Sequence, residues 1–309
     1  MGLRIQGEAA EAAGRAADLE VWRDAVRLHA RWLDRCEDGT PALLENLDLG
    51  DIHAPMARLT SAGFRSLQMP GSELKGAHLD ASRWEECDLS MGNLSCCDMS
   101  RSTWTNVNLS DASLSAANLN DAELQGVSLQ QVKAPGARWL EARISRCDFT
   151  NAVLRNCSFQ HARLLECLFL RTEMGSALFY RAAMQFCRFR EVAAVEAHFS
   201  AARIQSGDFV KCDLSGARFG EAELSGSSFL ECSLADCDFR GADLKGCRFS
   251  GSRLAGARFH DAKCFGADFR GADLSQTRGL SLRALIQART DQSTVLPNGA
   301  RGPAMRGIY

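Results

Sequence analysis

A large apolar residue recurs at every fifth position from Leu44 to Leu274, with few exceptions and with no slip in phase. The residue two places earlier is nearly always small, as in Cys147 before Phe149. Self-similarity at a fixed short period is typical of architectures built from stacked repeats. This repeat therefore limits the possible folds of the chain more than any other feature of the sequence.

A period of five fits neither a straight strand nor an α-helix. Side chains alternate along a strand, so positions five apart would point to opposite faces. In an α-helix, five steps of about 100° leave the apolar stripe roughly 140° out of place. The chain must therefore turn a corner in every repeat. Each large residue and the small residue before it then point to a common axis, and the other three positions face water.

The spacing of the phenylalanines indicates how many sides each coil has. From Phe149 to Phe269 the large residue is Phe at every tenth position, with mostly Leu-like residues between. A coil of fifteen residues would stack Phe on Leu, whereas a coil of twenty stacks Phe on Phe on two opposite sides. Like-on-like layers pack regularly, so four sides are predicted. The expected core ladders contain Phe149, Phe159, Phe169 and Phe179 on two sides and Leu214, Leu224, Leu234 and Leu244 on the other two.

The repeat units resemble those of the pentapeptide-repeat family, as in AlaAsnLeuAsnAsp at 117–121 and AlaAspPheArgGly at 267–271. The resemblance covers about 42–276 and implies an all-β solenoid, a right-handed, four-sided parallel β-helix. At twenty residues per coil and about 4.8 Å between strands, about 12 coils would extend roughly 55 Å. The family includes gyrase-protecting proteins, secreted effectors and many members without an assigned role, so the resemblance implies a fold rather than a function.

Both ends depart from the repeat. Residues 8–38 carry Leu19, Trp22 and Val26 at helical spacing, and Gly39-Thr40-Pro41 would stop a helix. An open coil end exposes apolar side chains and unpaired backbone, so 1–41 is predicted to be a helical cap, with a partner-binding helix as the alternative. In 277–309, Ser281 would N-cap a short helix over 282–288, followed by a tail that frays after about 300.

Charge and hydropathy exclude some classes of partner. The formal net charge is −2, which argues against direct nucleic-acid binding through a basic surface. Residues 44–130 carry 12 acidic and 5 basic side chains, a net of −7, and 131–280 carry 17 acidic and 21 basic, a net of +4. The asymmetry could orient a partner, or it could be drift in solvated faces. With no membrane-length apolar run and no signal-peptide core, the sequence predicts a cytoplasmic protein that does not bind membranes.

The thirteen cysteines do not follow a metal or disulfide pattern. Ten occupy the small inward position, where Cys replaces Ala as a compact apolar residue: Cys87, Cys97, Cys147, Cys157, Cys167, Cys187, Cys212, Cys232, Cys237 and Cys247. They are expected to be reduced, and only Cys36 and Cys96 are expected to be exposed. No metal site, cofactor or catalytic residue is predicted, since the histidines are scattered and a filled, convex coil lacks a concave pocket.

One surface feature stands out among otherwise polar outward positions. Large apolar or aromatic residues occupy such positions at Leu165, Leu168, Leu170, Leu178, Tyr180, Phe186, Val195, Val210 and Leu230. Clustered apolar side chains at a surface mark interaction sites. The sequence therefore predicts a patch for a protein partner or for self-association, with Leu165 and Phe186 adjacent and Leu168, Leu170, Val210 and Leu230 on one side.

These features favour a non-catalytic protein-binding scaffold whose partner is not identified. Three alternatives stay open. The first is a DNA-mimicking protector of gyrase, which the acidic 44–130 region would suit but the unbroken phase, without an inserted loop, would not. The second is an accessory or effector protein of a bacterial secretion system. The third is a self-assembling structural protein, including a homodimer formed through the C-terminal region.

Overall fold

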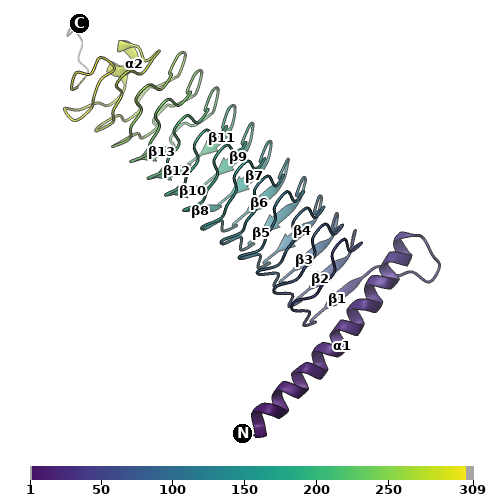
Figure 1. The fold of residues 1–309 in the computed structure, drawn as a ribbon. Helices are drawn as coiled ribbons and strands as arrows, with labels where there is room; N and C mark the ends of the chain where they lie inside the picture. Colours follow the sequence, from purple (N-terminus) through teal and green to yellow (C-terminus); the bar gives the residue numbers. More distant parts are fainter. Residues whose placement is uncertain (1, 304–309) are drawn as a thin grey trace. The chain divides into compact units, whose positions relative to one another are not determined.

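The structure, a computed structural model, describes residues 2–303, with side chains from residue 14 onward. Contacts group the chain into two compact units, Met1–Arg138 and Trp139–Tyr309. Each unit is built from parallel β-coils (Figure 1). The division at 41 and 276 expected from the sequence stays a prediction.

The first unit contains one helix and a ladder of short parallel strands. The helix is α1 (Gly2–Leu33). The strands are β1 (Leu43–Glu45), β2 (Gly63–Arg65), β3 (Arg83–Glu85), β4 (Thr103–Thr105) and β5 (Glu123–Gln125). Each strand pairs with the next in a register of twenty residues, as the partners Leu44 and Phe64 show.

Backbone bridges show that each coil has four sides. Within the first coil, parallel pairs join β1 to β2, Asp48 to Gln68, His53 to Glu73 and Arg58 to His78. The four pairs begin five residues apart, and every partner lies twenty residues further along the chain. The predicted four-sided parallel β-helix is therefore confirmed.

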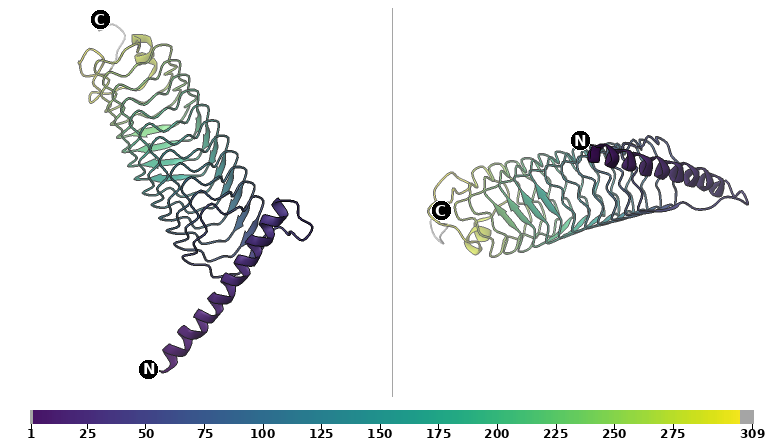
Figure 2. Two further views of the ribbon diagram at one scale, coloured as in Figure 1. Left: turned by 45° about the vertical axis from the view of Figure 1, so that its right-hand side comes forward. Right: turned by 90° about the horizontal axis from the view of Figure 1, so that it is seen from below.

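The second unit carries strands on two adjacent sides of its coils (Figure 2). One side contains β6 (Arg143–Ser145), β7 (Arg163–Leu165), β9 (Ala183–Gln185) and β11 (Arg203–Gln205). The next side contains β8 (Leu168–Leu170), β10 (Arg188–Arg190), β12 (Asp208–Val210) and β13 (Ser228–Leu230). The other two sides are joined by single bridges, such as Glu173 to Ala193 and Leu178 to His198.

The number of turns marked by strands differs slightly from the predicted 12 coils. On the side that includes β1, five strands mark turns in the first unit and four in the second, about nine in all. Beyond β11 that side continues through single bridges, Glu223 to Asp243 and Asp243 to Lys263. A residue period predicts where the chain turns, but it does not predict how many consecutive residues in each turn will pair as a strand.

The corners are tight turns with one residue in the left-handed region. At a typical corner the backbone N–H of Ala112 donates to the carbonyl of Leu109 at 3.1 Å, and Asp111 has a φ of 60°. A positive φ at the third residue is the mark of a type II turn. The positive φ recurs at every fifth residue from Asn46 to Gln276, and it bends the extended chain into a square coil.

Aromatic stacks fill the axis of the second unit. Phe149 and Phe169 lie one coil apart, with ring centroids separated by 4.8 Å and planes by 5°. Phe159 and Phe179 stack in the same way at 4.9 Å on the opposite side. Neighbouring Phe residues of the two stacks meet edge to face, as Phe149 and Phe159 do. The Leu members of the expected ladders, Leu214, Leu224, Leu234 and Leu244, are buried as well.

Several polar side chains at the small inward position donate a hydrogen bond to a carbonyl of the preceding coil. The hydroxyl of Thr172 donates to the carbonyl of Phe149 at 2.8 Å, and the thiol of Cys247 donates to the carbonyl of Leu224 at 2.9 Å. Both bonds connect residues 23 apart. This shared geometry allows Cys, Ser or Thr to replace Ala at such a position, because a buried hydroxyl or thiol there can reach an acceptor. Ser72 is an exception, since its buried Oγ has no hydrogen-bond partner.

Helix α1 ends earlier than predicted. It stops at Leu33 rather than at residue 38. Arg35 takes a φ of 60°, and the N–H of Cys36 donates to the carbonyl of Arg31 at 2.9 Å. This is a Schellman ending, which closes a helix without the glycine that usually forms it. Gly39 has another role, because a Cβ there would lie 2.2 Å from the backbone N of Trp32.

Helix α1 contacts the first coil of its unit, and Figure 1 shows it at the β1 end. The Trp22 ring is buried 6.2 Å from the Phe64 ring. The carboxylate of Asp18 accepts a hydrogen bond from the backbone N–H of Asp48 at 2.9 Å. A backbone N–H group at the end of the coil is therefore hydrogen-bonded to the helix. These contacts support the predicted role of the helix as a cap.

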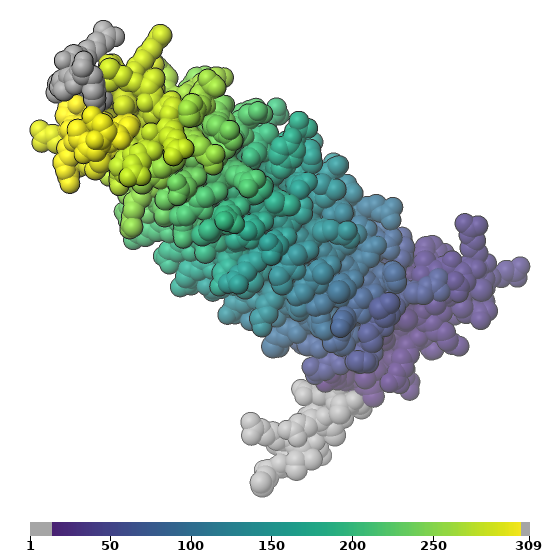
Figure 3. All heavy atoms as spheres, turned by 45° about the horizontal axis from the view of Figure 1, so that its top comes forward, coloured from purple at the N-terminus to yellow at the C-terminus, as the bar shows by residue number. Residues whose placement is uncertain are grey.

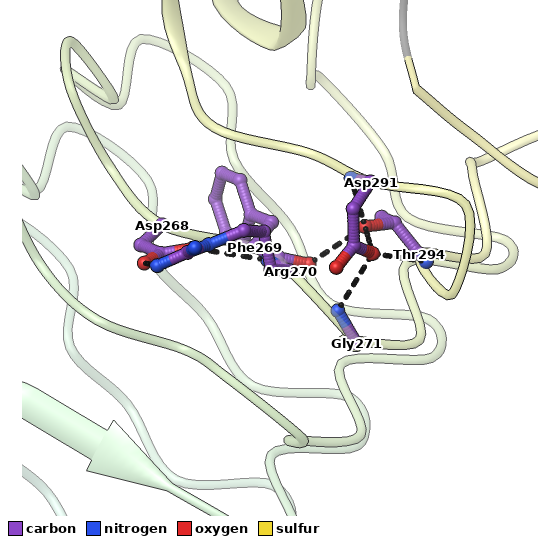
Figure 4. A network of polar contacts seen from close by, with 6 residues as sticks. All are labelled: Asp268, Phe269, Arg270, Gly271, Asp291 and Thr294. Carbon is purple, nitrogen blue, oxygen red and sulfur yellow. Dashed lines mark hydrogen bonds and ion pairs between the residues drawn. The ribbon is translucent and has the colours of Figure 1, made fainter.

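At the C-terminal end, α2 (Leu282–Gln287) starts at the predicted N-cap, where Ser281 Oγ accepts from the N–H of Ala284. Leu285 is buried. After α2, one Asp291 carboxylate oxygen accepts from the N–H groups of Gly271, Ser293 and Thr294 at 3.0–3.3 Å (Figure 4). Thr294 Oγ1 donates to the carbonyl of Phe269, which ties this segment to the last Phe residue. The predicted fraying falls mainly on 304–309, which lie outside the described residues.

Candidate interaction surface

Four of the predicted surface residues gather at one corner of the second unit. Leu165 ends β7, and Leu168 and Leu170 point outward from β8 just beyond the corner. Phe186 lies at the same corner one coil later. Phe186 is 57% exposed and Leu165 is 40% exposed, whereas the outward Leu side chains of β8 are half-buried. We call these four residues the corner patch.

The remaining predicted residues divide among three sides, and one of them, Val195, is exposed beside Ala193 on the side that follows β10. Val210 and Leu230 lie in register with Leu170, but Arg190 stands between Leu170 and Val210. Val210 and Leu230 therefore continue the line of apolar side chains from Leu170, but Arg190 separates them from the corner patch. Leu178 pairs with His198 two sides away, and Tyr180 follows it there, so neither belongs to the patch.

Tyr180 has its own set of contacts. The guanidinium carbon of Arg181 lies 5.1 Å from the centre of the Tyr180 ring, and His161 meets that ring edge to face. Tyr180 also borders a shallow hollow of about 670 Å³ that is floored by small residues, among them Ser200 and Gly220.

The charged groups of this hollow are already paired or exposed. Arg240 binds Asp238 with two hydrogen bonds, the shorter at 2.6 Å, and holds the pKa of that carboxyl below its usual value. A carboxyl that is held ionised in this way is not suited to act as a general acid. Arg218 and Glu221 line the rest of the hollow and are exposed.

The sequence predictions missed several exposed apolar residues. Phe265 is 65% exposed and lies directly after an inward position, the same place in the repeat as Leu165. Met56 and Met91 in the first unit are exposed to a similar degree. The repeat phase could have identified all three, because none of them falls on an inward position.

The cysteines lie where the repeat predicts. Cys36 and Cys96 are exposed, and the other eleven are buried. Burial raises the pKa of the Cys87 thiol to about 11 and of the Cys97 and Cys247 thiols to about 12. Such thiols remain protonated near neutral pH, so they are poor nucleophiles and poor metal ligands.

The described part of the chain contains neither a cluster of metal ligands nor a helix suited to span a membrane. Within it, no three His, Cys, Asp or Glu residues are grouped so that they could hold a metal ion. Neither of the described helices combines the length and the apolar character needed to cross a bilayer. Figure 3 shows the side chains of successive coils of the second unit, coloured teal to yellow, packed closely across the visible face.

Comparisons with known proteins agree with this geometry. The family model described as "Pentapeptide repeat region" matches residues 182–259, and the model "Pentapeptide repeats (8 copies)" matches 93–131 and 140–169. A comparison with curated protein sequences gave no match.

Two solved structures, of a pentapeptide-repeat protein and of a resistance protein, are among those that this chain matches. HetL from the cyanobacterium Nostoc sp. strain PCC 7120, involved in heterocyst differentiation regulation, is 20% identical, with a TM-score of 0.28 over 87% of this chain and 98% of its own. Full-length QnrB1, a plasmid-mediated fluoroquinolone resistance protein, is 18% identical, with a TM-score of 0.25 over 83% of this chain and 94% of its own. Since the family models match repeats in both units, and those repeats form four-sided coils of twenty residues, this chain belongs to the pentapeptide-repeat family.

Proposed function

We propose that this protein is a non-catalytic scaffold that binds a protein partner through the corner patch. The observation that carries the proposal is the cluster of Leu165, Leu168, Leu170 and Phe186 on a surface whose outward positions are mostly polar. Exposed apolar side chains that cluster, rather than scatter, mark interaction sites. Aromatic residues are also enriched among the residues that dominate binding energy.

The chemistry of the described residues supports a binding role. The hollows are shallow, the carboxylate of the Asp238–Arg240 pair is held ionised, and burial raises the pKa of core thiols such as Cys247 to about 12. A rigid stack of coils can instead present side chains at fixed spacings. The proposal places the protein in the cytosol, where its thirteen cysteines would stay reduced.

The test is affinity purification with two matched double variants. The variant Leu165→Ser/Phe186→Ser removes the exposed part of the corner patch. The control Met56→Ser/Met91→Ser removes two equally exposed apolar residues from the first unit. A partner retained by the wild type and by the control, but lost by the patch variant, supports the proposal. Equal retention by both variants, with unchanged circular dichroism, would refute it.

One alternative has support of its own. The net charge of −7 over 44–130 and the ladder of acidic and amide side chains, in which Asn93 donates to Glu73 and Asn108 to Asp88, suit imitation of a nucleic-acid surface. A gyrase supercoiling assay with and without a quinolone tests this role. Protection of gyrase from the quinolone at micromolar protein would support a gyrase-protecting role, and absence of protection would exclude that role.

A homodimer through the C-terminal region is a separate proposal. Leu282 of α2 is 38% exposed, whereas Leu285 is buried against the last coil. Light scattering should therefore compare the intact chain with Leu282→Ser, which leaves the buried contact in place. A monomeric mass for both proteins would exclude this dimer.

A further inference from the structure

We infer that the segment bound by the corner patch is acidic as well as apolar. The inference rests on the proposed function and narrows it to one class of partner, a short amphipathic helix that carries carboxylates. Two observations at the corner support it, the backbone conformation of Phe186 and the charges beside the patch.

Phe186 holds a conformation that disfavours its own side chain. Its φ of 54° lies in the left-handed region. A bulky residue is sterically strained in this region, whereas glycine adopts it readily. All fifteen corners from Glu141 to Lys211 have a non-glycine residue in this conformation, whereas eight of the twelve corners from Gly216 to Gly271 are glycine. Phe186 is the one large apolar residue among these fifteen. The side chain at Phe186 is therefore best explained by contacts outside the fold.

The charges beside the patch are mainly guanidinium groups. Arg163 shares β7 with Leu165, and Arg188 lies in register with Leu168. Both are exposed, and neither forms an ion pair with any residue whose side chain the structure describes. Arg171 at the next corner is exposed in the same way. Glu166 and Glu191 are the carboxylates at these two corners, and Asp208, which lies in register with Arg188, is paired with Arg190 instead.

This pattern matches a helix with apolar anchors and acidic flanks. The patch occupies two neighbouring coils, which lie about 4.8 Å apart at the usual strand spacing. Residues i and i+3 of an α-helix are about 4.5 Å apart along its axis on one face, close to this spacing. Carboxylates beside such anchors could pair with the free guanidinium groups, which bind carboxylates in two-pronged hydrogen bonds. A basic helix would bring its charges against Arg163 and Arg188 instead.

Fluorescence anisotropy with two labelled synthetic peptides tests the inference on the full chain. Both peptides carry leucine at the same i, i+3, i+4 and i+7 positions, and their polar positions are Glu in one and Lys in the other. The Glu peptide should bind saturably at low salt and should lose at least tenfold in affinity with Phe186→Ser or Arg188→Glu. The matched control Arg218→Glu reverses an exposed arginine on another side and should change nothing.

Two results would overturn the inference, and they have different consequences. If the Lys peptide binds as tightly as the Glu peptide, or if Arg188→Glu has no effect, the partner is not acidic. If Phe186→Ser still weakens peptide binding in that case, the proposal that the corner patch is a docking surface is retained. If Phe186→Ser has no effect on any binding, both the inference and the proposed function fail.

Discussion

The backbone N–H of Ala42 donates a hydrogen bond to Nδ1 of the buried His29 side chain at 3.0 Å. Nδ1 must be unprotonated to accept this bond, so the ring is neutral when α1 is docked. Its surroundings favour the neutral form. Burial, as the largest cause, and the nearby Arg58 lower the pKa of His29 below 6.5, and a backbone hydrogen bond at Thr60 opposes them.

The docking of α1 is therefore expected to weaken in mild acid. Above pH 6.5 His29 is neutral in both the folded and the unfolded chain, so it causes no loss of stability. As the pH falls below 6.5, the unfolded chain takes up the proton first, and stability declines until the lower folded-state pKa is passed. Amide hydrogen exchange of α1 should accordingly speed up between pH 7.5 and pH 5 relative to the coils.

The variant His29→Asn isolates this effect. Its side-chain oxygen can still accept from Ala42, but it does not titrate in this range. The acid-dependent exchange of α1 should disappear in the variant. Parallel pH curves for wild type and variant would show that another group is responsible.

Asp291 should stabilise the C-terminal closure down to low pH. Hydrogen bonds from Ser293, Gly271 and Thr294 lower the pKa of its carboxyl from 3.8 to about 2. Because the folded-state pKa is the lower one, the contribution is complete above pH 3.8 and is lost as the pH falls through 2. Asp291→Ala should lower the melting temperature at neutral pH, and Asp291→Asn, which keeps one acceptor oxygen, should lower it less. Equal melting temperatures for the three proteins would contradict this role.

The reactivity of the thiols should show directly whether the interior of the coils is accessible to solvent. Cys36 and Cys96 are exposed, and the remaining eleven thiols are buried. A native-state titration with Ellman's reagent should therefore detect two thiols rapidly and all thirteen after denaturation. More than two fast thiols in the native protein would mean that the coils open readily.

Two phenylalanines, one buried and one exposed, allow the contribution of the core to stability to be measured. Phe209 is 1% exposed and stacks between Phe189 and Phe229, whereas Phe265 is 65% exposed. Phe209→Ala should lower the free energy of unfolding by about 3–5 kcal/mol, since it leaves a cavity in the stack. Phe265→Ala should change it by less than about 0.5 kcal/mol. Urea denaturation measures both, and similar losses would contradict the assignment of inward and outward positions.

The five-residue period predicted the core because burial follows directly from repeat phase. Once Phe149 and Phe169 are placed twenty residues apart on a square coil, their stacking is a matter of geometry. The period could not predict the end of α1, which depends on Arg35 adopting a left-handed conformation that favours glycine. Nor could it predict the number of paired strands, which depends on small differences in backbone angle.

The surface was predictable only in part. Phase identified Leu165 and Phe186 as outward, and the twenty-residue register placed them side by side. The same reasoning applied to Leu178 and Tyr180 shows that they lie on the side opposite β8 and beyond the other corner of the β7 side, although composition alone grouped them with the others. Which arginines are left without an ion pair depends on side-chain geometry, so the free guanidinium groups of Arg163 and Arg188 emerged only from the structure.

The most direct test of the central claim is the free energy of unfolding of Phe186→Gly, with Ser206→Gly as its control. Ser206 occupies the same corner one coil later, with a φ of 52°. If the Phe186 side chain serves binding rather than folding, relief of the left-handed strain should raise the free energy of unfolding by about 1 kcal/mol in both variants. Only Phe186→Gly should lose the partner. A clear fall in stability for Phe186→Gly, beside a rise for Ser206→Gly, would show that Phe186 is a packing residue and would contradict the account.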